Sequence, residues 1–307
     1  MVACITRLLR ASLAKSTHQV YHRAWALFHQ AMSELNIPFR GSQDLPLPVT
    51  KIIIYVGYLN CQNLSPSTIL SYVSAIGYAH KFKGVPNPTT HTSVQKLLAA
   101  AHKFKPSVDA RLPITIVILI ELVQTLQTIV SNPYHRLLLQ AMYVIAFFGL
   151  MRVGEITSTK SGVVALKLDQ VQIFTTHVVL TISKFKHNVS LRPIQLVLPA
   201  QDNKLICPVA VLINYLHVRG LEPGPLFSFV DGAPVKRDFF INILKRNLNF
   251  CGLDSKLYKS HSFRIGGASL YASMGLSNAQ IRLIGRWNSD AFVKYIRCER
   301  ILLALTK

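Results

Sequence analysis

The sequence predicts a mainly helical α+β protein, in which a helical N-terminal domain precedes a mixed α/β domain with a small antiparallel β-sheet. Three observations predict this class. Apolar residues recur at helical spacing through the first hundred residues, short β-rich runs cluster between residues 171 and 198, and helical patterns return from residue 208. The chain has 307 residues, of which 50% are hydrophobic, so it can fill the cores of two domains.

The N-terminal domain is expected to span residues 1–105 as a bundle of four helices. Ser16-Thr17 can cap the first helix, because hydroxyl side chains satisfy the free backbone amides at a helix start. Ser65-Pro66 gives the same signal for the third helix, with proline at the first helical position. Proline-containing loops at 38–48 and 86–88 separate the helices. The apolar face of the first helix comprises Val20, Ala24, Leu27, Phe28 and Met32.

Residues 106–111 are expected to form a linker, because the stretch around them is polar and contains Pro106. The second domain then spans residues 112–307. It is expected to open with two helices, the second of which is the apolar run 133–148. The β-rich runs are 171–174, 178–182 and 194–198, and a basic turn separates the last two.

The charge of the chain predicts a polyanionic partner. Lys and Arg number 34 against 13 Asp and Glu, which gives a net charge of +21. A positive excess of this size favours nucleic acid as the partner. A membrane surface, or a basic protein with no such partner, is the alternative that charge leaves open.

The remaining composition predicts a protein of a reducing compartment. The five cysteines are odd in number and form no CxxC pair, so neither a disulfide framework nor a zinc site is expected, and we expect no metal and no other cofactor. The N-terminal residues lack the layout of a signal peptide. The apolar run 137–151, which Arg136 and Arg152 bracket, is 15 residues, whereas a membrane span needs ~20. We therefore expect a cytosolic or nuclear protein without a membrane association.

Arg152 is the first candidate for chemistry. It follows the apolar run 133–148, which would deliver its guanidinium to the edge of a core, and a guanidinium suits a two-pronged grip on phosphate. Glu155 lies three residues on and could orient it on one helical face. An arginine that merely ends a helix on the surface has the same local sequence.

His261 and Arg264 form the second candidate pair. They are three residues apart and would share a helical face, so that the histidine could move a proton while the arginine holds a phosphate. Gly266-Gly267 follows and allows close approach of a backbone. A histidine that caps a helix or lies in a core is the alternative for His261.

Tyr295 is the candidate nucleophile. It is expected on a helix that Ser289-Asp290 caps, away from the inward stripe of Phe292 and Ile296, so that its hydroxyl can face a groove. An ordinary tyrosine of an amphipathic helix would look the same. On the turn between the last two β-rich runs, Lys184 and Lys186 could reach DNA, and a partly desolvated ammonium can act as an acid.

Taken in order, these residues resemble the tyrosine recombinases, also called phage-integrase-type recombinases. The resemblance covers most of the chain, from the Ser16-Thr17 helix to the C-terminus. Gly285-Arg286-Trp287, followed by Tyr295-Ile296-Arg297, looks most like the recombinases of eukaryotic mobile elements, namely DIRS-like or Ngaro-like retrotransposons and Cryptons.

The resemblance implies a role for each residue. Arg152 matches the first catalytic arginine and Glu155 the acidic residue after it. Lys184 matches the hairpin lysine, with Lys186 as the second choice. His261 and Arg264 match the His-x-x-Arg box, and Tyr295 the nucleophile. Trp287 is assigned to the late His-or-Trp position, although it lies eight residues before the tyrosine and Arg286 holds the ninth place, where many relatives have the His or Trp.

What the resemblance implies for function is site-specific DNA cleavage and rejoining through a 3′-phosphotyrosine, without metal or nucleotide, for the integration of a mobile element. The alternatives are a domesticated DNA-binding protein without activity and a type IB topoisomerase, which shares this chemistry. The implied partner is double-stranded DNA.

The same resemblance implies a homo-tetramer on DNA. The C-terminal segment 296–307 carries the apolar run 301–305, which could dock on a neighbouring protomer or pack on its own domain. If the source is eukaryotic, as the motifs indicate, a nuclear protein follows, and otherwise a cytoplasmic one.

Overall fold

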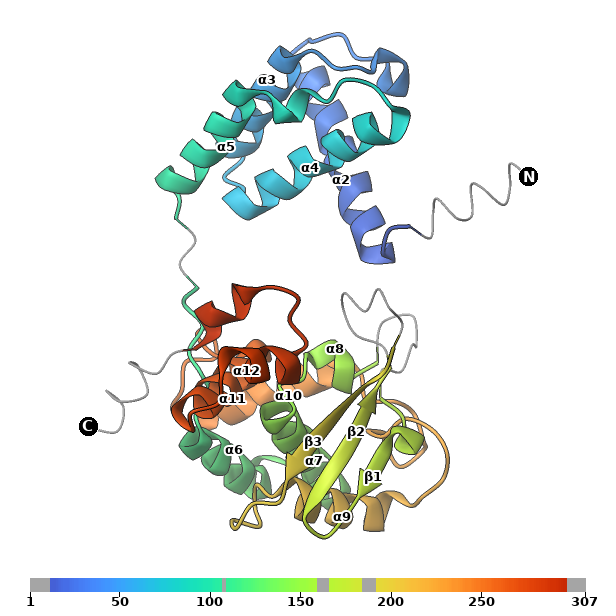
Figure 1. Cartoon of the computed structure of the whole chain (residues 1–307), viewed down its shortest axis with the longest axis vertical. Coiled ribbons are helices and arrows are strands. Elements are labelled where there is room, and N and C mark those ends of the chain that lie inside the picture. The colour runs from blue at the N-terminus through green and yellow to red at the C-terminus, as the bar shows by residue number, and fades with distance from the viewer. Residues whose placement is uncertain (1–11, 107–108, 159–165, 184–191, 297–307) are drawn as a thin grey trace. The chain divides into compact units, whose positions relative to one another are not determined.

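The computed structural model describes residues 12–106, 109–158, 166–183 and 192–296. The chain divides into two compact units, 1–109 and 110–307, so the boundary falls inside the stretch 106–111 (Figure 1). The architecture is α+β as predicted, because among the described residues the first unit contains helices only and the second combines helices with one antiparallel sheet.

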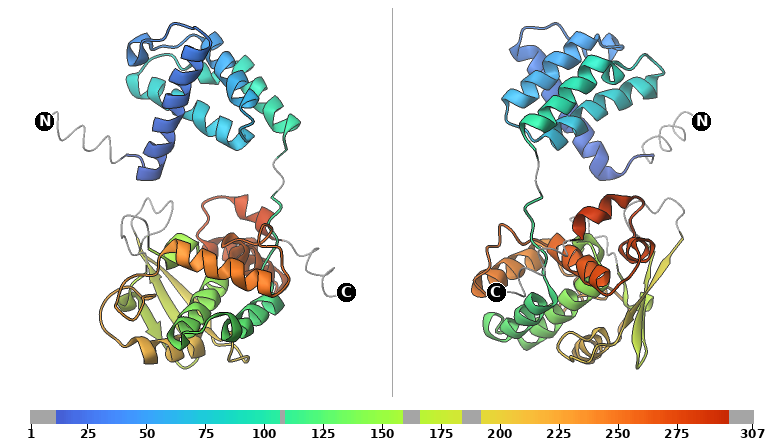
Figure 2. Two further views of the ribbon diagram at one scale, coloured as in Figure 1. Left: turned by 180° about the vertical axis from the view of Figure 1, so that it is seen from behind. Right: turned by 60° about the vertical axis from the view of Figure 1, so that its left-hand side comes forward.

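The first unit is a helical bundle whose elements are α2 (Lys15–Glu34), η1 (Gly41–Asp44), α3 (Val49–Cys61), α4 (Pro66–Lys83), η2 (Pro88–Thr90) and α5 (Thr92–Phe104). Figure 2 shows this bundle from two further sides. Its core contains Phe28, Tyr55 and Ile76, all without exposed surface. The Tyr55 hydroxyl donates to the Ala24 carbonyl at 2.7 Å, which ties α3 to α2.

Local sequence signals mark the ends of α4, but α2 begins at Lys15 with Ala14 at its N-cap, so the predicted cap by Ser16-Thr17 was wrong. The Ser65 hydroxyl accepts from the Thr68 amide at 3.2 Å, and Pro66 opens α4, as predicted. Gly84 ends α4 at φ 67°, a left-handed conformation that glycine adopts without strain. The apolar face of α2 differs from its prediction at Val20, which is 39% exposed, because this turn lies at the open end of the bundle's core.

The second unit has α6 (Ile116–Ile129), α7 (Pro133–Phe148), α8 (Val153–Ile156), η3 (Leu168–Gln170), α9 (Pro208–Arg219), α10 (Arg237–Phe250), α11 (His261–Ser273), α12 (Asn278–Gly285) and η4 (Asp290–Tyr295). Its strands β1 (Val171–Ile173), β2 (His177–Ile182) and β3 (Ile194–Pro199) form an antiparallel sheet in the order β1-β2-β3. Leu180 of β2 pairs with Val171 on one side and Leu196 on the other.

Helix α7 is the centre of the second unit. From Ala141 to Phe148 every residue is buried, because α6, α9 and α11 all pack against it. The sheet adds Val178, Leu180 and Ile182 to the same core. The apolar run in the sequence is therefore a buried core helix, and none of the described helices is both long and apolar enough to cross a membrane.

Two glycines bring α11 against its neighbours. A Cβ on Gly266 would lie 1.7 Å from the Ile114 carbonyl oxygen, and one on Gly267 would lie 2.3 Å from the Phe147 carbonyl oxygen. Both obstacles are backbone atoms, which cannot move aside as a side chain can. The close approach predicted for Gly266-Gly267 therefore fixes the position of α11, and with it the residues at its N-terminus.

Gly266→Ala should destabilise the second unit by about 3 kcal/mol, because the new methyl group overpacks a backbone contact. Thermal or chemical unfolding followed by circular dichroism measures this. Gly154→Ala is the matched control, since a Cβ there would meet nothing within 4 Å, and its stability should stay within about 1 kcal/mol of the wild type. Equal stability of the two variants would contradict the argument.

Candidate active site

The predicted site residues that the structure describes lie on or next to α8, α11, α12 and η4. Helix α11 contacts α12, η4 and α7, and α8 follows α7 directly, so these elements gather beside the C-terminal end of α7 (Figure 1). Segments more than a hundred residues apart in sequence therefore supply one cluster of side chains.

Arg152 lies at the N-terminal cap of α8, outside the helix. The prediction that Arg152 and Glu155 share a helical face was therefore wrong. The two residues still pair as expected. The Arg152 guanidinium donates to Glu155 Oε1 at 2.8 Å, and the Arg152 amide donates to Oε2 at 2.9 Å. The Arg152 side chain remains 19% exposed.

Arg286 is the second partner of Glu155. Its Nη2 donates to Glu155 Oε2 at 2.7 Å, and its side chain has no exposed surface. Burial alone would raise the pKa of Glu155, but the charges of Arg286 and Arg152 outweigh burial and hold that pKa below its usual value. Glu155 is therefore ionised and holds two arginines.

The turn between α7 and α8 accepts further hydrogen bonds from arginine. Leu150 adopts φ 45°, a left-handed conformation that costs energy for a side chain with a Cβ. Its carbonyl oxygen accepts from Arg286 Nη2 at 3.1 Å and from Arg264 Nη1. The Gly149 carbonyl accepts from Arg286 Nη1 at 3.2 Å. The strained turn is thus held by two guanidinium groups.

Arg264 lies fully buried beneath Trp287. Its Nη2 donates to the Gly285 carbonyl at 2.8 Å, and its guanidinium carbon lies 4.4 Å from the centroid of the Trp287 ring. Burial, together with the charges of Arg152 and Arg286, lowers the pKa of Arg264 to about 9, which keeps it charged at neutral pH. Within the described residues, its Nε is buried without a hydrogen-bond partner.

Trp287 depends on the glycine two residues before it. A Cβ on Gly285 would lie 1.7 Å from a Trp287 ring atom, so only glycine admits the ring here. Arg286, between them, adopts φ 54° and turns the chain back after α12. The Trp287 ring then lies between Arg264 and Phe292, whose ring centroid is 5.3 Å away.

Tyr295 ends a 3-10 helix, η4, where an α-helix had been predicted. Its half-buried ring has its centroid 5.8 Å from that of Trp287 and 6.0 Å from that of His261. The Ser269 hydroxyl donates to the Tyr295 carbonyl at 3.2 Å and anchors the end of η4 to α11. The expected inward residue Phe292 is buried, as predicted.

His261 is the first residue of α11, so its imidazole lies at the helix end that faces η4. The His261 and Tyr295 rings meet at 60°, edge to face. His261 thus contacts the tyrosine, while Arg264, three residues on in the same helix, belongs to the buried cluster.

Arg111 is a residue of the site that sequence analysis missed. It had been assigned to the linker, yet its guanidinium carbon lies 6.0 Å from the centroid of the Tyr295 ring. The chain is fixed here because the Leu112 amide donates to the Leu257 carbonyl at 2.8 Å and the Ile114 amide to the Ser262 carbonyl at 3.0 Å. A lone arginine in a polar stretch carries no pattern that could have revealed this.

The structure thus brings together Arg152, Glu155, His261, Arg264, Arg286, Trp287 and Tyr295. Of the two residues considered for the late His-or-Trp position, Trp287 contacts Arg264 and Tyr295, whereas Arg286 is bound to Glu155 and backbone carbonyls. Lys184, Lys186 and the terminal residues 297–307 lie outside the described residues.

The cluster suits the binding of an anion beside a tyrosine. Arg152, Arg264 and Arg286 together carry more positive charge than the single carboxylate of Glu155 neutralises, in surroundings that water barely reaches. No group of three or more His, Cys, Asp or Glu side chains that could hold a metal occurs among the described residues. The described cysteines Cys61, Cys207 and Cys251 are all free thiols.

Comparison with known proteins supports this fold. No protein-family model matches the chain. The chain is 24% identical over 305 residues to an integrase/recombinase XerD homolog from Selenomonas ruminantium, which covers 94% of this chain and 84% of that protein.

Solved structures of DNA recombinases share the fold. XerH recombinase in a post-cleavage complex with its difH substrate has a TM-score of 0.64 at 16% identity, over 94% of this chain and 78% of that chain. The Tn1549 transposon integrase in complex with transposon right-end DNA has a TM-score of 0.62 at 13% identity. The match covers 99% of this chain and 98% of that chain. A lambda integrase tetramer on a Holliday junction has a TM-score of 0.59 at 16% identity. The match covers 93% of this chain and 72% of that chain.

Glu155→Gln should destabilise the protein at neutral pH by roughly 3 kcal/mol or more, because buried arginines lose their counter-charge. The folded pKa of Glu155 is lowered, so its contribution is complete above the unfolded value of about 4.3 and is lost as pH falls through the folded pKa. The stability difference from the wild type should therefore shrink in acid, as urea unfolding at several pH values would show.

Glu121→Gln provides the control, because Glu121 is exposed on α6. Its substitution should leave stability nearly unchanged at every pH. If the stability of the Glu155→Gln variant equalled that of the wild type at every pH, the buried ion pair would contribute nothing to stability.

Proposed function

We propose that this chain is a tyrosine recombinase, which cleaves and rejoins DNA at specific sites through a covalent 3′-phosphotyrosine. The observation that carries the proposal is the placement of Tyr295 against Trp287 and His261, beside the buried guanidinium of Arg264. The similarity to the XerD homolog and the fold shared with DNA-bound recombinases support it.

In the proposed reaction the arginines receive the scissile phosphate. Arg152 offers a partly exposed side chain, and Arg264 adds a second positive charge against the Trp287 ring. Charge builds on the non-bridging oxygens in the transition state, and fixed donors there lower the barrier. Because Arg264 is fully buried, direct contact with a phosphate requires the Trp287 ring to shift aside.

Tyr295 is the proposed nucleophile. Its phenol oxygen forms the new bond to phosphorus while the bond to the 5′-oxygen breaks, and His261, at the edge of the tyrosine ring, accepts the phenol proton. By resemblance, Lys184, or else Lys186, gives a proton to the departing 5′-oxygen. The phosphotyrosine conserves the bond energy, so we propose that neither a metal nor a nucleotide is needed.

Tyr295 also interacts electrostatically with the positive cluster, because it is among the groups whose charge raises the pKa of Arg264. The proposed order of events is binding of the phosphate, transfer of the phenol proton to His261 and attack.

The proposal extends to partners and setting. Duplex DNA is the substrate, and a homo-tetramer is the working assembly, as in the lambda integrase complex with a Holliday junction. Integration of a mobile element is the proposed role, by analogy with the Tn1549 integrase and the DIRS-like, Ngaro-like and Crypton resemblance. That resemblance is also the support for a nuclear location.

Tyr295→Phe should leave DNA binding intact and abolish the covalent adduct, because the variant lacks the attacking oxygen. A nicked suicide substrate traps cleavage, and a denaturing gel detects the protein–DNA band in the presence of EDTA. Tyr271→Phe is the control, since that hydroxyl is buried and donates to the Phe148 carbonyl at 2.7 Å. Binding without a band in the wild type would indicate a DNA-binding protein that does not cleave.

Arg111→Ala should slow adduct formation by about tenfold or more, with unchanged affinity for DNA, because Tyr295 loses the cation beside its ring. Arg111→Lys keeps the charge and should recover part of the rate. An unchanged rate of adduct formation would remove Arg111 from the site.

A further inference from the structure

We propose that residues 1–11 form an amphipathic helix that folds back and docks in an apolar groove between α2 and α4 of the first unit. These eleven residues lie outside the described residues, whereas the lining of the groove is described. The segment and the groove both belong to the first unit, so this contact is separate from the chemistry proposed at Tyr295.

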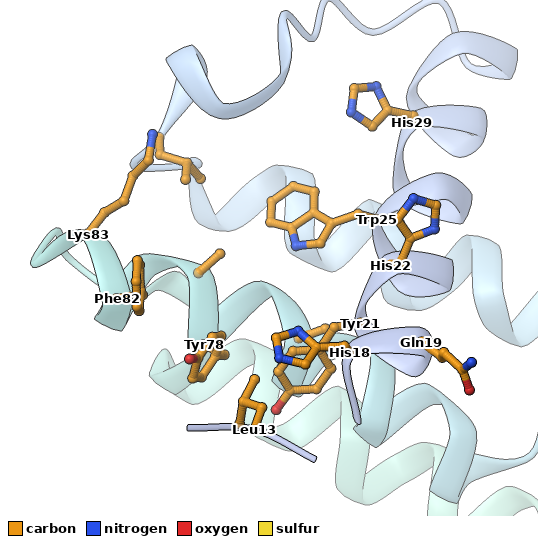
Figure 3. Close-up of a pocket in the computed structure, with 13 residues that line it drawn as sticks. Leu13, His18, Gln19, Tyr21, His22, Trp25, His29, Tyr78, Phe82 and Lys83 are labelled. Carbon is orange, nitrogen blue, oxygen red and sulfur yellow. The ribbon is translucent and has the colours of Figure 1, made fainter. Parts of the chain in front are cut away.

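The groove has a volume of about 840 Å³. Its lining is mainly aromatic and apolar, with Tyr21 and Trp25 from α2 and Ala75, Tyr78 and Phe82 from α4. Figure 3 shows Trp25 extending from α2 towards α4, with Tyr78 and Phe82 on the opposite side. Phe82 is 53% exposed although it is fully apolar. Apolar side chains that gather at one open recess mark a surface that another segment covers.

The described chain begins beside this groove. Leu13 lines it, and α2 begins at Lys15 after Ala14, whose ψ of 145° is extended rather than helical. The residues before Ala14 therefore do not continue the axis of α2. Ser12 alone stands between the segment and Leu13, so residues 1–11 start at the edge of the groove and need no spacer to reach it.

The segment has the residue pattern of a helix that covers an apolar surface. In a helical conformation one of its faces carries only apolar side chains, among them Val2, Ile5, Leu8 and Leu9. Arg7 and Arg10 fall on the opposite face. An isolated helix shorter than about 12 residues is marginal in water, so residues 1–11 need a surface on which to fold.

The length of the segment matches the length of the groove. The lining residues of α2 run from His18 to His29, which are eleven residues apart, a rise of about 16 Å. A helix of residues 1–11 rises by about the same length. Leu13 and His29 lie at opposite ends of the groove in Figure 3.

The connection between the segment and α2 also has a suitable length. It consists of residues 12–14, and about 2–5 residues join the two antiparallel helices of an αα-hairpin. Residues 1–11 can therefore run antiparallel to α2 along the whole groove.

The charges of the segment suit docking through its apolar face. None of the groove's lining residues is acidic, and Lys83, which is exposed, adds a cation. A helix docked in this way turns Arg7 and Arg10 towards water, so that no charge is buried. The opposite orientation would bury both guanidinium groups without an acidic partner. Docking thus replaces an apolar recess with a solvated positive surface.

The chain offers its own reporter of docking. Its two tryptophans are the half-buried Trp25 in the groove and Trp287 in the candidate active site, so Trp25 is the sole tryptophan of a Trp287→Phe protein. Deletion of residues 2–11 from that protein should expose Trp25 to water. Its fluorescence should move to longer wavelength, and its quenching by acrylamide should increase. A synthetic peptide of residues 1–11 should reverse both changes and saturate.

Two substitutions in the segment give the matched test in the full chain. Leu9→Asp, made in the Trp287→Phe protein, should expose Trp25 as the deletion does, because it places a carboxylate on the apolar face. Arg10→Asp is the control, since this side chain lies on the opposite face and stays in water. It alters the net charge more than Leu9→Asp does, so an effect of charge alone would be larger for the control. If the truncated protein does not fold, these two variants decide.

Three results would overturn the proposal. They are an unchanged Trp25 signal after deletion, equal effects of Leu9→Asp and Arg10→Asp, and protection of Trp25 that dilution removes while analytical ultracentrifugation shows a dimer dissociating. The last would assign the groove to the segment of a second copy. Binding of the peptide to phosphatidylserine vesicles, without any effect on Trp25 of the truncated protein, would assign the segment to a lipid surface and also overturn the proposal.

Discussion

The buried carboxylate of Glu155 is the group on which the geometry of the candidate site depends. Three arginines gather around the turn between α7 and α8, and three positive charges do not assemble out of water unless something opposes their repulsion. One carboxylate oxygen of Glu155 accepts a hydrogen bond from the Arg152 guanidinium, and the other accepts one from the Arg286 guanidinium. The carbonyl of Leu150 then joins Arg286 to Arg264, so one acid and one peptide oxygen order all three guanidinium groups.

This arrangement separates positioning from chemistry. Both terminal nitrogens of Arg286 donate to backbone carbonyls, and Nη2 also donates to Glu155, so Arg286 holds the turn after α12, while Trp287 contacts Arg264. Gly285 admits the tryptophan ring, and Gly266 seats α11 on the segment that follows Arg111. Packing thereby fixes the side chains that contact Tyr295. Tyr295 itself lies on the short 3-10 helix η4.

The sequence predicted the elements more completely than it predicted their contacts. The apolar run became α7, and the three β-rich runs became the antiparallel sheet almost residue for residue, because hydrophobic periodicity is a local property. The pairing of Arg152 with Glu155 was also local. The role of Arg286 was not readable, since its partners lie more than 130 residues away and its left-handed backbone leaves no trace in the order of residues. Val20 shows the opposite error, an apolar residue at the right spacing that the bundle does not cover.

Arg111 changes where one should divide this protein. Its segment is hydrogen-bonded into the second unit through Leu112 and Ile114, and its side chain stands beside Tyr295, so a stretch that reads as a spacer belongs to the second unit. In a chimaera that joins the first unit of one such protein to the second unit of another, the junction therefore belongs upstream of Ala110. A junction placed after Arg111 would exchange a component of the surroundings of Tyr295 along with the first unit.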